Sequence, residues 1–253
     1  MKKKVEILNY WNQRFKDNGI LSAGYTDKLI QKIDDKNRWK SFIREVNLKR
    51  GESILDAGCN YGYWSLRLAK LGMIVTGIDI IDEAIKVAKN NAKKAFLKIN
   101  FQKIQVENLD FGNNKFDKII SITVLQHILN DRSYLKSLKN FNRQLKGKGE
   151  LIMIESAPNK RKKEKLSFKR ERTFEDQVKY CSKAGFKLIK LKGIYSLSAK
   201  WYYGIQKFGF SKKTEKYFQV LGIKILNPIE VLLTKFSFLA KFSNLKLMIF
   251  KKI

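Results

Sequence analysis

The chain contains few of the residues that build covalent cross-links or metal sites. Its 253 residues include two cysteines and one histidine. Cys59 and Cys181 lie far apart in the sequence, so they suggest neither a disulfide framework nor a zinc site, and they fit a reducing cytosol. Because His127 is the only histidine and no cluster of metal ligands stands out, we expect no metal cofactor.

Long apolar runs are also missing. Lys2, Lys3 and Lys4 are followed by polar residues such as Glu6, which interrupt the apolar core that a signal peptide needs. No stretch reaches the length of a membrane span. These absences predict a cytoplasmic protein, and 253 residues suffice for one α/β domain with additions.

Acidic side chains are scarce. The chain has 53 Lys and Arg against 23 Asp and Glu, a net charge of +30. Residues 159–253 hold 24 basic and 6 acidic side chains, whereas residues 51–158 hold 16 and 11. Such a basic third favours an anionic partner: RNA, a phosphorylated glycan, or a membrane with which the protein would associate peripherally. A lysine-rich surface without a specific partner explains the same excess, and both interpretations stay open.

The most informative stretch covers residues 53–66 and reads SILDAGCNYGYWSL. The apolar pair Ile54 and Leu55 predicts a buried strand, which Asp56 ends. Gly58 and Gly62 bracket a tight turn and would let the backbone pass close to a ligand, and helical spacing follows them. A strand, a glycine-bearing turn and a helix in this order open a nucleotide-binding βαβ unit.

The dinucleotide fingerprint G-x-G-x-x-G is absent, because Asn60 and Tyr63 stand where its second and third glycines belong. Asp56 would repel a diphosphate and suits a cationic or hydrogen-bond-donating end of a ligand. The stretch resembles the first motif of the class I S-adenosylmethionine-dependent methyltransferases, D-x-G-x-G-x-G, at Asp56, Gly58 and Gly62. Asn60 replaces the middle glycine, which a left-handed conformation of asparagine would allow. The resemblance implies S-adenosylmethionine as the cofactor.

The next strand continues the resemblance. It is predicted over 74–78 and ends at Asp79, about twenty residues past the glycines, where a carboxylate can accept both ribose hydroxyls. Asp79 would alternatively cap the helix that follows, but Asp82 suits that N-cap position better. The resemblance also places Ile80 in the cofactor site.

Two further strands complete the predicted cofactor site. After the strand at 100–104 comes Gln105, whose amide could accept a hydrogen bond from the adenine amino group, and then Val106. The strand at 116–123 ends at Thr123. The resemblance covers about residues 48–192 and implies cofactor contacts at Gln105, Val106 and Thr123.

These motifs predict an α/β fold with a doubly wound, seven-stranded, mostly parallel sheet of the Rossmann-like methyltransferase type. We expect an N-terminal helical cap at 1–50, the methyltransferase core at 51–194, a helical insertion at 195–244 and the last strand at 245–253. In the cap, Trp11 and Tyr25 are candidate pocket residues, although core packing is the simpler role for Trp11.

Several element ends carry local signals. A helix from Asp131 should end at Gly147, a residue type typical of helix C-termini, before a fifth strand at 149–155. Thr173 should cap the next helix, and the alternation over 186–194 predicts the sixth strand.

The insertion at 195–244 is rich in aromatic residues and contains an amphipathic run after Pro228. We expect a helical lid that shapes the acceptor site, because the insertion would sit at the ligand-binding edge of the sheet. The alternative is an interfacial helix that touches a membrane through apolar residues flanked by Lys235 and Lys241.

The chemistry follows from the cofactor. A sulfonium is a strong leaving group, so the protein mainly has to align the acceptor, the methyl group and the sulfur. An oxygen acceptor must also lose a proton, and His127 suits the role of general base. Glu155 is a second catalytic candidate, for binding the acceptor or assisting deprotonation. His127 would alternatively only cap or pack the turn after the fourth strand.

Two sequence features of nucleic-acid methyltransferases are absent, which narrows the classes of acceptor that we expect. Residues 121–124 lack the N-P-P-Y-like run of the nucleic-acid amino-methylating members of this class, and no cysteine is placed for attack on cytosine. We therefore predict a methyltransferase that acts at oxygen on a small-molecule, glycan or lipid acceptor. An RNA methyltransferase that uses the basic C-terminal third, and a non-catalytic S-adenosylmethionine-binding protein, remain as alternatives.

Overall fold

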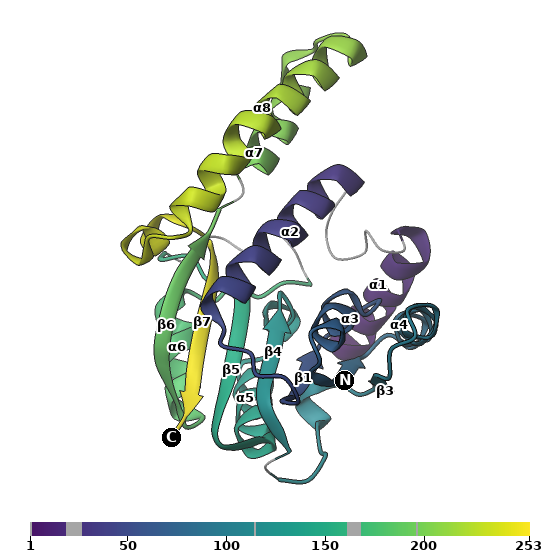
Figure 1. Ribbon diagram of the computed structural model, residues 1–253, viewed down its shortest axis with the longest axis vertical. Coiled ribbons are helices and arrows are strands. Elements are labelled where there is room, and N and C mark those ends of the chain that lie inside the picture. The colour runs from purple at the N-terminus through teal and green to yellow at the C-terminus, as the bar shows by residue number, and fades with distance from the viewer. Residues whose placement is uncertain (1, 19–26, 114, 161–167, 196) are drawn as a thin grey trace.

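The computed structural model describes residues 2–18, 27–113, 115–160, 168–195 and 197–253. The strands form one seven-stranded sheet in the order β3-β2-β1-β4-β5-β7-β6 (Figure 1). The strands are β1 (Ser53–Ala57), β2 (Ile74–Asp79), β3 (Asn100–Lys103), β4 (Phe116–Ile122), β5 (Leu145–Ser156), β6 (Phe186–Ile194) and β7 (Leu245–Lys252). Strand β7 is antiparallel to both neighbours, and the other pairings are parallel. The predicted mostly parallel α/β sheet is confirmed.

Helices cover both faces of the sheet. The α-helices are α1 (Lys2–Asn18), α2 (Lys28–Glu45), α3 (Tyr63–Lys70), α4 (Asp82–Lys94), α5 (Asp131–Gln144), α6 (Phe174–Lys183), α7 (Leu197–Ile205) and α8 (Lys212–Leu233). Short 3-10 helices are η2 (Val106–Asn108), η3 (Leu125–His127), η4 (Gln206–Phe208) and η5 (Ser237–Phe242). Leu55 of β1 packs in one cluster with Leu138 of α5. Its neighbour Ile54 packs in another, with Phe42 of α2 and Leu68 of α3, because successive strand residues point to opposite faces.

Most element ends agree with the sequence pattern, and the end of α5 is the main exception. The helix ends at Gln144 and β5 begins at Leu145, so Gly147 lies inside the strand and the predicted C-terminal glycine is wrong. Leu145 is fully buried and pairs with Phe116 of β4, which holds it in an extended conformation. The sixth strand has its predicted bounds, and Thr173 caps α6 as predicted.

The helical insertion before the last strand is confirmed, and it packs along α2. In Figure 1, α7 and α8 extend together beyond the end of β6. Asn37 of α2 donates to Glu230 of α8 over 3.2 Å, and Arg44 donates to the carbonyl of Thr234 over 3.0 Å. Tyr202 of α7 donates to Asp27, the N-cap of α2, over 2.9 Å. Within the described ranges, no helix combines the length and the apolar character needed to cross a membrane.

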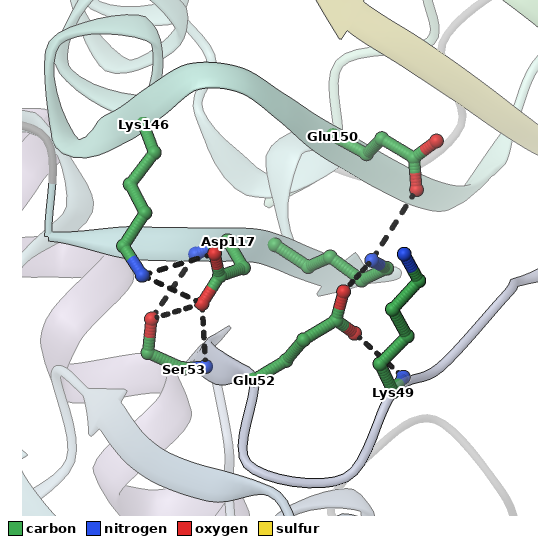
Figure 2. Close-up of polar contacts among 7 residues, drawn as sticks. Lys49, Glu52, Ser53, Asp117, Lys146 and Glu150 are labelled. Carbon is green, nitrogen blue, oxygen red and sulfur yellow. Dashed lines mark hydrogen bonds and ion pairs between the residues drawn. The ribbon is translucent and has the colours of Figure 1, made fainter.

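A polar network joins the amino-terminal ends of β1, β4 and β5, opposite the edge where these strands end (Figure 2). The backbone N–H and the hydroxyl of Ser53 donate to Oδ2 of Asp117 over 2.8 and 2.7 Å. Lys146 of β5 donates to both carboxylate oxygens of Asp117, over 2.9 and 2.8 Å. Burial alone would raise the pKa of Asp117, but the bonds from Lys146 and Ser53 lower it to about 2.

We expect Asp117→Asn to lower the free energy of unfolding at pH 7 by about 1 kcal/mol, the scale of one hydrogen bond or ion pair near the surface. Asp117 keeps its charge in the folded protein down to about pH 2, whereas an unfolded aspartate takes up its proton near pH 4, at a pKa of about 3.9. The stabilisation is therefore complete above roughly pH 4 and is lost as the pH falls towards 2. Urea unfolding of both proteins at pH 7 and pH 3 measures the difference.

The matched control is Glu83→Gln, which removes an exposed ion pair with Lys86 on α4. This change should alter the free energy of unfolding by less than about 0.5 kcal/mol. An Asp117→Asn effect of the same size at pH 7 and pH 3 would mean that the charge of Asp117 is not what stabilises the strand ends.

Candidate functional site

A cavity of about 500 Å³ opens at the carboxyl ends of β1, β2 and β4. Strand β1 lies between β2 and β4, so this edge is the switch point at which open α/β sheets bind ligands. The wall includes Asp56 from β1, Asp79 from β2 and Thr123 directly after β4. The N-terminal helices also contribute, through Trp11 of α1 and Asp35 of α2. Tyr25, the other candidate from the cap, lies outside the described residues.

The turn between β1 and α3 has the backbone conformations that its sequence predicts. The φ angle is +83° at Gly58, +85° at Gly62 and +48° at Asn60, so the asparagine is in the left-handed conformation. A Cβ at position 58 would lie 2.2 Å from Cγ2 of Val124, and one at position 62 would lie 2.8 Å from Cδ1 of Leu66. The close approach at the glycines is therefore between parts of the protein, whereas we expected it towards a ligand.

Asp56 and Asp79 line the same cavity from neighbouring strands. Ser65 of α3 donates to Oδ2 of Asp56 over 2.6 Å, and burial raises the pKa of Asp56 to about 7. The N–H of Ile81 donates to Oδ1 of Asp79 and the N–H of Asn60 to Oδ2, each over 2.9 Å. Burial also raises the pKa of Asp79. A carboxylate can accept about four hydrogen bonds, so Asp79 keeps room for a bond from a ligand hydroxyl.

The start of α4 differs from the prediction. The N-cap is Ile81 and makes no side-chain capping bond, so Asp82 is the first helical residue and not the cap. Asp79 accepts the N–H of Ile81 instead, and thereby holds the chain between β2 and α4 while its carboxylate lines the cavity.

The other predicted cofactor residues also lie in the cavity wall: Ile80, Gln105, Val106 and Thr123. Nε2 of Gln105 donates to Glu107 over 3.2 Å, which leaves the amide oxygen of Gln105 as an acceptor. Thr123 has a φ of +57°, which is rare for a β-branched residue. Its N–H donates to the carbonyl of Ile154 over 2.7 Å. Backbone strain of this kind is concentrated at functional sites.

His127 lies in the cavity wall at the end of η3, and its ring contacts Trp11 edge to face with 4.5 Å between centroids. Nδ1 lies 2.9 Å from the carbonyl oxygen of Phe168, which can only accept, so Nδ1 carries the proton. Nε2 therefore holds the lone pair, 3.2 Å from the side-chain amide of Gln126. Burial lowers the pKa of His127 to about 4, so the ring is neutral at physiological pH.

Glu155, the second catalytic candidate, is not among the cavity-lining residues. Its Oε1 accepts the N–H groups of Val124 and Leu125, over 2.8 and 2.9 Å, and the hydroxyl of Ser121 over 3.2 Å. Burial raises the pKa of Glu155 to about 7. The carboxyl group thus fixes the chain that leads from β4 into η3, and so positions His127.

Sequence reasoning missed the polar residues of α2. Gln31, Asp35 and Arg38 lie in the wall, and burial raises the pKa of Asp35 to about 6 although nearby Arg38 lowers it. None of the described residues of 195–244 lies in the wall, because α2 stands between the insertion and the cavity. Among the described residues, no group of three His, Cys, Asp or Glu side chains is placed to hold a metal ion.

Two acids on adjacent parallel strands, a glycine-bearing turn between them and a cavity at the switch point define an α/β protein that binds a nucleoside-type cofactor. A family described as "Methyltransferase domain" matches residues 48–209. The chain belongs to this methyltransferase family, in the class I group that uses S-adenosylmethionine.

Individual relatives match only part of the chain. The ubiquinone biosynthesis O-methyltransferase of Coxiella burnetii (strain Dugway 5J108-111) is 38% identical over 100 residues, which are 40% of this chain and 42% of that protein. An S-adenosyl-L-methionine-dependent Diels-Alderase of Talaromyces variabilis is 34% identical over 147 residues, 56% of this chain and 48% of that one. The chain thus spans less than half the length of these relatives.

One solved structure illustrates the shared fold. The phosphoethanolamine N-methyltransferase 2 of Haemonchus contortus, in complex with phosphomonomethylethanolamine and S-adenosylhomocysteine, superposes with a TM-score of 0.64. The superposition covers 96% of this chain and 59% of that chain at 17% identity. At this identity the likeness concerns the fold alone.

Proposed function

We propose that the protein transfers a methyl group from S-adenosylmethionine to an oxygen of a small-molecule, glycan or lipid acceptor. The observation that carries the proposal is the pair of carboxylates, Asp56 and Asp79, on one cavity beside the glycine turn. Oxygen is the favoured acceptor atom because the Coxiella relative is named an O-methyltransferase. No relative or structure cited above is named for RNA, so the RNA alternative has no support from them.

The residues of the cavity fit the cofactor. Asp79 offers two carboxylate oxygens to ribose hydroxyls, and Gln105 offers its amide oxygen to the adenine amino group. Asp56 offers negative charge to the ammonium group or the sulfonium. When bound, S-adenosylmethionine supplies a methyl group on a positively charged sulfur. The protein then has to orient the acceptor and accept its proton.

Two groups in the wall could accept that proton. His127 presents the lone pair of Nε2, and the bond from Nδ1 to the Phe168 carbonyl fixes this tautomer. The amide of Gln126 faces Nε2 and has to turn away before an acceptor hydroxyl can bond there. Asp35 is the second group, with a pKa of about 6. We assign the role of base to His127 because it lies in η3, the short helix that follows β4, and Glu155 holds the start of this helix by accepting the N–H groups of Val124 and Leu125.

The test combines calorimetry with S-adenosylhomocysteine and a transfer assay with S-adenosylmethionine labelled in its methyl group. We expect binding, and label in a small-molecule or lipid fraction of a cell extract that no protein-free control shows. Absence of binding refutes the cofactor assignment. Binding without transfer supports the non-catalytic alternative, which matters because one relative is named a Diels-Alderase and not a methyltransferase. Label in RNA would restore the RNA alternative.

The affinity for S-adenosylhomocysteine should rise about tenfold between pH 6 and pH 8. With a pKa of about 7 in the free protein, Asp56 is mostly protonated at pH 6 and mostly ionised at pH 8. The ionised form attracts the ammonium group of the ligand, so binding favours loss of the proton. Calorimetry across this range measures the effect, and Asp56→Asn should bind more weakly and without the rise. If Asp56→Asn shows the same rise, a group other than Asp56 causes the pH dependence.

A further inference from the structure

The helical hairpin of α7 and α8, taken with η4 and η5 as residues 197–242, exposes many large apolar side chains. On α8, Tyr217, Leu221, Ile225 and Leu232 are 65%, 38%, 55% and 50% exposed. Their spacing of four, four and seven residues places them on one face of the helix, and we call them the α8 stripe. Further exposed aromatic residues are Trp201, Phe208, Phe210, Phe236, Phe238 and Phe242. An apolar surface of this extent marks an interaction site.

The opposite face of α8 packs against α7 and α2, so the stripe faces the solvent. Glu230 is buried and accepts from the N–H and the hydroxyl of Ser198 over 2.7 and 2.8 Å. At Gly222, an added Cβ would lie 2.0 Å from the ring of Trp201, so α7 and α8 are in close contact there. Asn37 of α2 holds Glu230 from the other side. The hairpin is therefore attached to the body through polar bonds on its inner face.

The exposed charged side chains of the hairpin are predominantly positive. Residues 195–244 contain eight lysines, two glutamates, no arginine and no aspartate. All eight lysines are exposed. Glu230 is buried, and Glu215 accepts a hydrogen bond from Gln219 over 2.7 Å on the inner side of α8. The apolar stripe is thus surrounded by positive charge, with Lys213, Lys216 and Lys224 on α8 itself.

A second feature points to lipid. A groove of about 560 Å³ lies between α7 and α8, with a wall that is nearly all apolar. Its lining includes Trp201, Ile205, Phe208, Phe218 and Leu226. Acyl chains suit such a groove, whereas nucleic-acid surfaces combine stacking rings with cations that bond to phosphates.

We propose that the α7–α8 hairpin binds to the surface of a bilayer that carries anionic head groups. The α8 stripe enters the outer acyl region, and the exposed lysines lie at the level of the head groups. Aliphatic members of the stripe, such as Leu221 and Ile225, favour a bilayer over RNA because they offer no stacking surface. The 22 residues of α8 measure about 33 Å, so the helix would lie along the surface. This contact extends well beyond the segment near Lys235 that the sequence pattern indicated.

The test is co-sedimentation of the full chain with vesicles of phosphatidylcholine, with and without about one third phosphatidylserine. We expect binding to the anionic vesicles at least tenfold tighter than to the neutral ones, and weaker binding at high salt. The stripe variant Leu221→Gln, Ile225→Gln, Leu232→Gln should lose at least tenfold in affinity for the anionic vesicles.

The matched control changes three exposed apolar residues outside the hairpin: Leu71→Gln, Ile74→Gln, Phe96→Gln. It should bind as the unchanged protein does, and calorimetry with S-adenosylhomocysteine checks that both variants keep the folded core. Three results would overturn the proposal. They are no vesicle binding by the unchanged protein, equal losses in the stripe and control variants, and binding to a single-stranded RNA probe that outcompetes the vesicles. None of these readouts depends on methyl transfer.

Discussion

Replacing Asp79 with alanine should weaken the binding of S-adenosylhomocysteine by about a hundredfold. The substitution removes the two carboxylate oxygens proposed to accept ribose hydroxyls. Hydrogen bonds to charged groups contribute about 1.5–3 kcal/mol each, and about 2.8 kcal/mol corresponds to a hundredfold change in the dissociation constant. Calorimetry at pH 8, where Asp56 is mostly ionised, measures the change directly.

The control has to separate ligand contacts from local structure, because Asp79 also accepts the N–H groups of Asn60 and Ile81. Thermal unfolding without ligand shows how much stability the variant loses. Asp82→Ala is the matched substitution, since Asp82 lies three residues further on, half exposed and not in the cavity wall. It should bind the ligand normally. A folded Asp79→Ala protein with unchanged affinity would refute the ribose assignment.

The cofactor side of the site could be predicted because its residues lie at or just after the ends of strands with a clear burial pattern. Ile54 and Leu55 are fully buried, which identifies them as residues of a central strand. The glycines that follow must then lie where the chain leaves the sheet, at the end of β1. The carboxyl ends of parallel strands meet at one edge, which brings Asp56 and Asp79 to the same cavity. The positive φ of Asn60 was predictable because asparagine tolerates it.

The residues of α2 in the cavity wall could not be predicted, because α2 faces the cavity on one side and α8 on another. Asp35 lines the cavity while Asn37 bonds to α8, so both are buried polar residues on one helix. Sequence periodicity assigns such residues to a solvent-exposed face. The attachment of the insertion to α2 was missed for the same reason. Its helices were predictable from composition and pattern, but their attachment depends on Glu230, whose partners Ser198 and Asn37 lie 32 and 193 residues away.

Substituting His127 with glutamine should reduce kcat by about a thousandfold, within the range that general base catalysis contributes. Glutamine can still donate to the Phe168 carbonyl but has no basic nitrogen. Affinity for S-adenosylhomocysteine should stay within about twofold, because the proposed cofactor contacts lie at other residues. The matched control is Gln126→Met, which removes the amide beside Nε2 and should leave kcat equal or higher. A His127→Gln enzyme with kcat reduced less than tenfold would assign His127 a structural role.

The pH profile of kcat distinguishes His127 from Asp35 as the base. With a pKa of about 4, His127 is neutral and able to accept a proton at every pH above that value. With a pKa of about 6, Asp35 would be protonated and inactive as a base below pH 6. At saturating S-adenosylmethionine, so that protonation of Asp56 does not limit binding, kcat should therefore stay constant from pH 8 to about pH 5. A kcat that falls tenfold for each pH unit below 6 would instead indicate Asp35. Loss of activity in Asp35→Asn would then assign the proton transfer to Asp35. In that case α2 would carry the group that takes the proton of the acceptor.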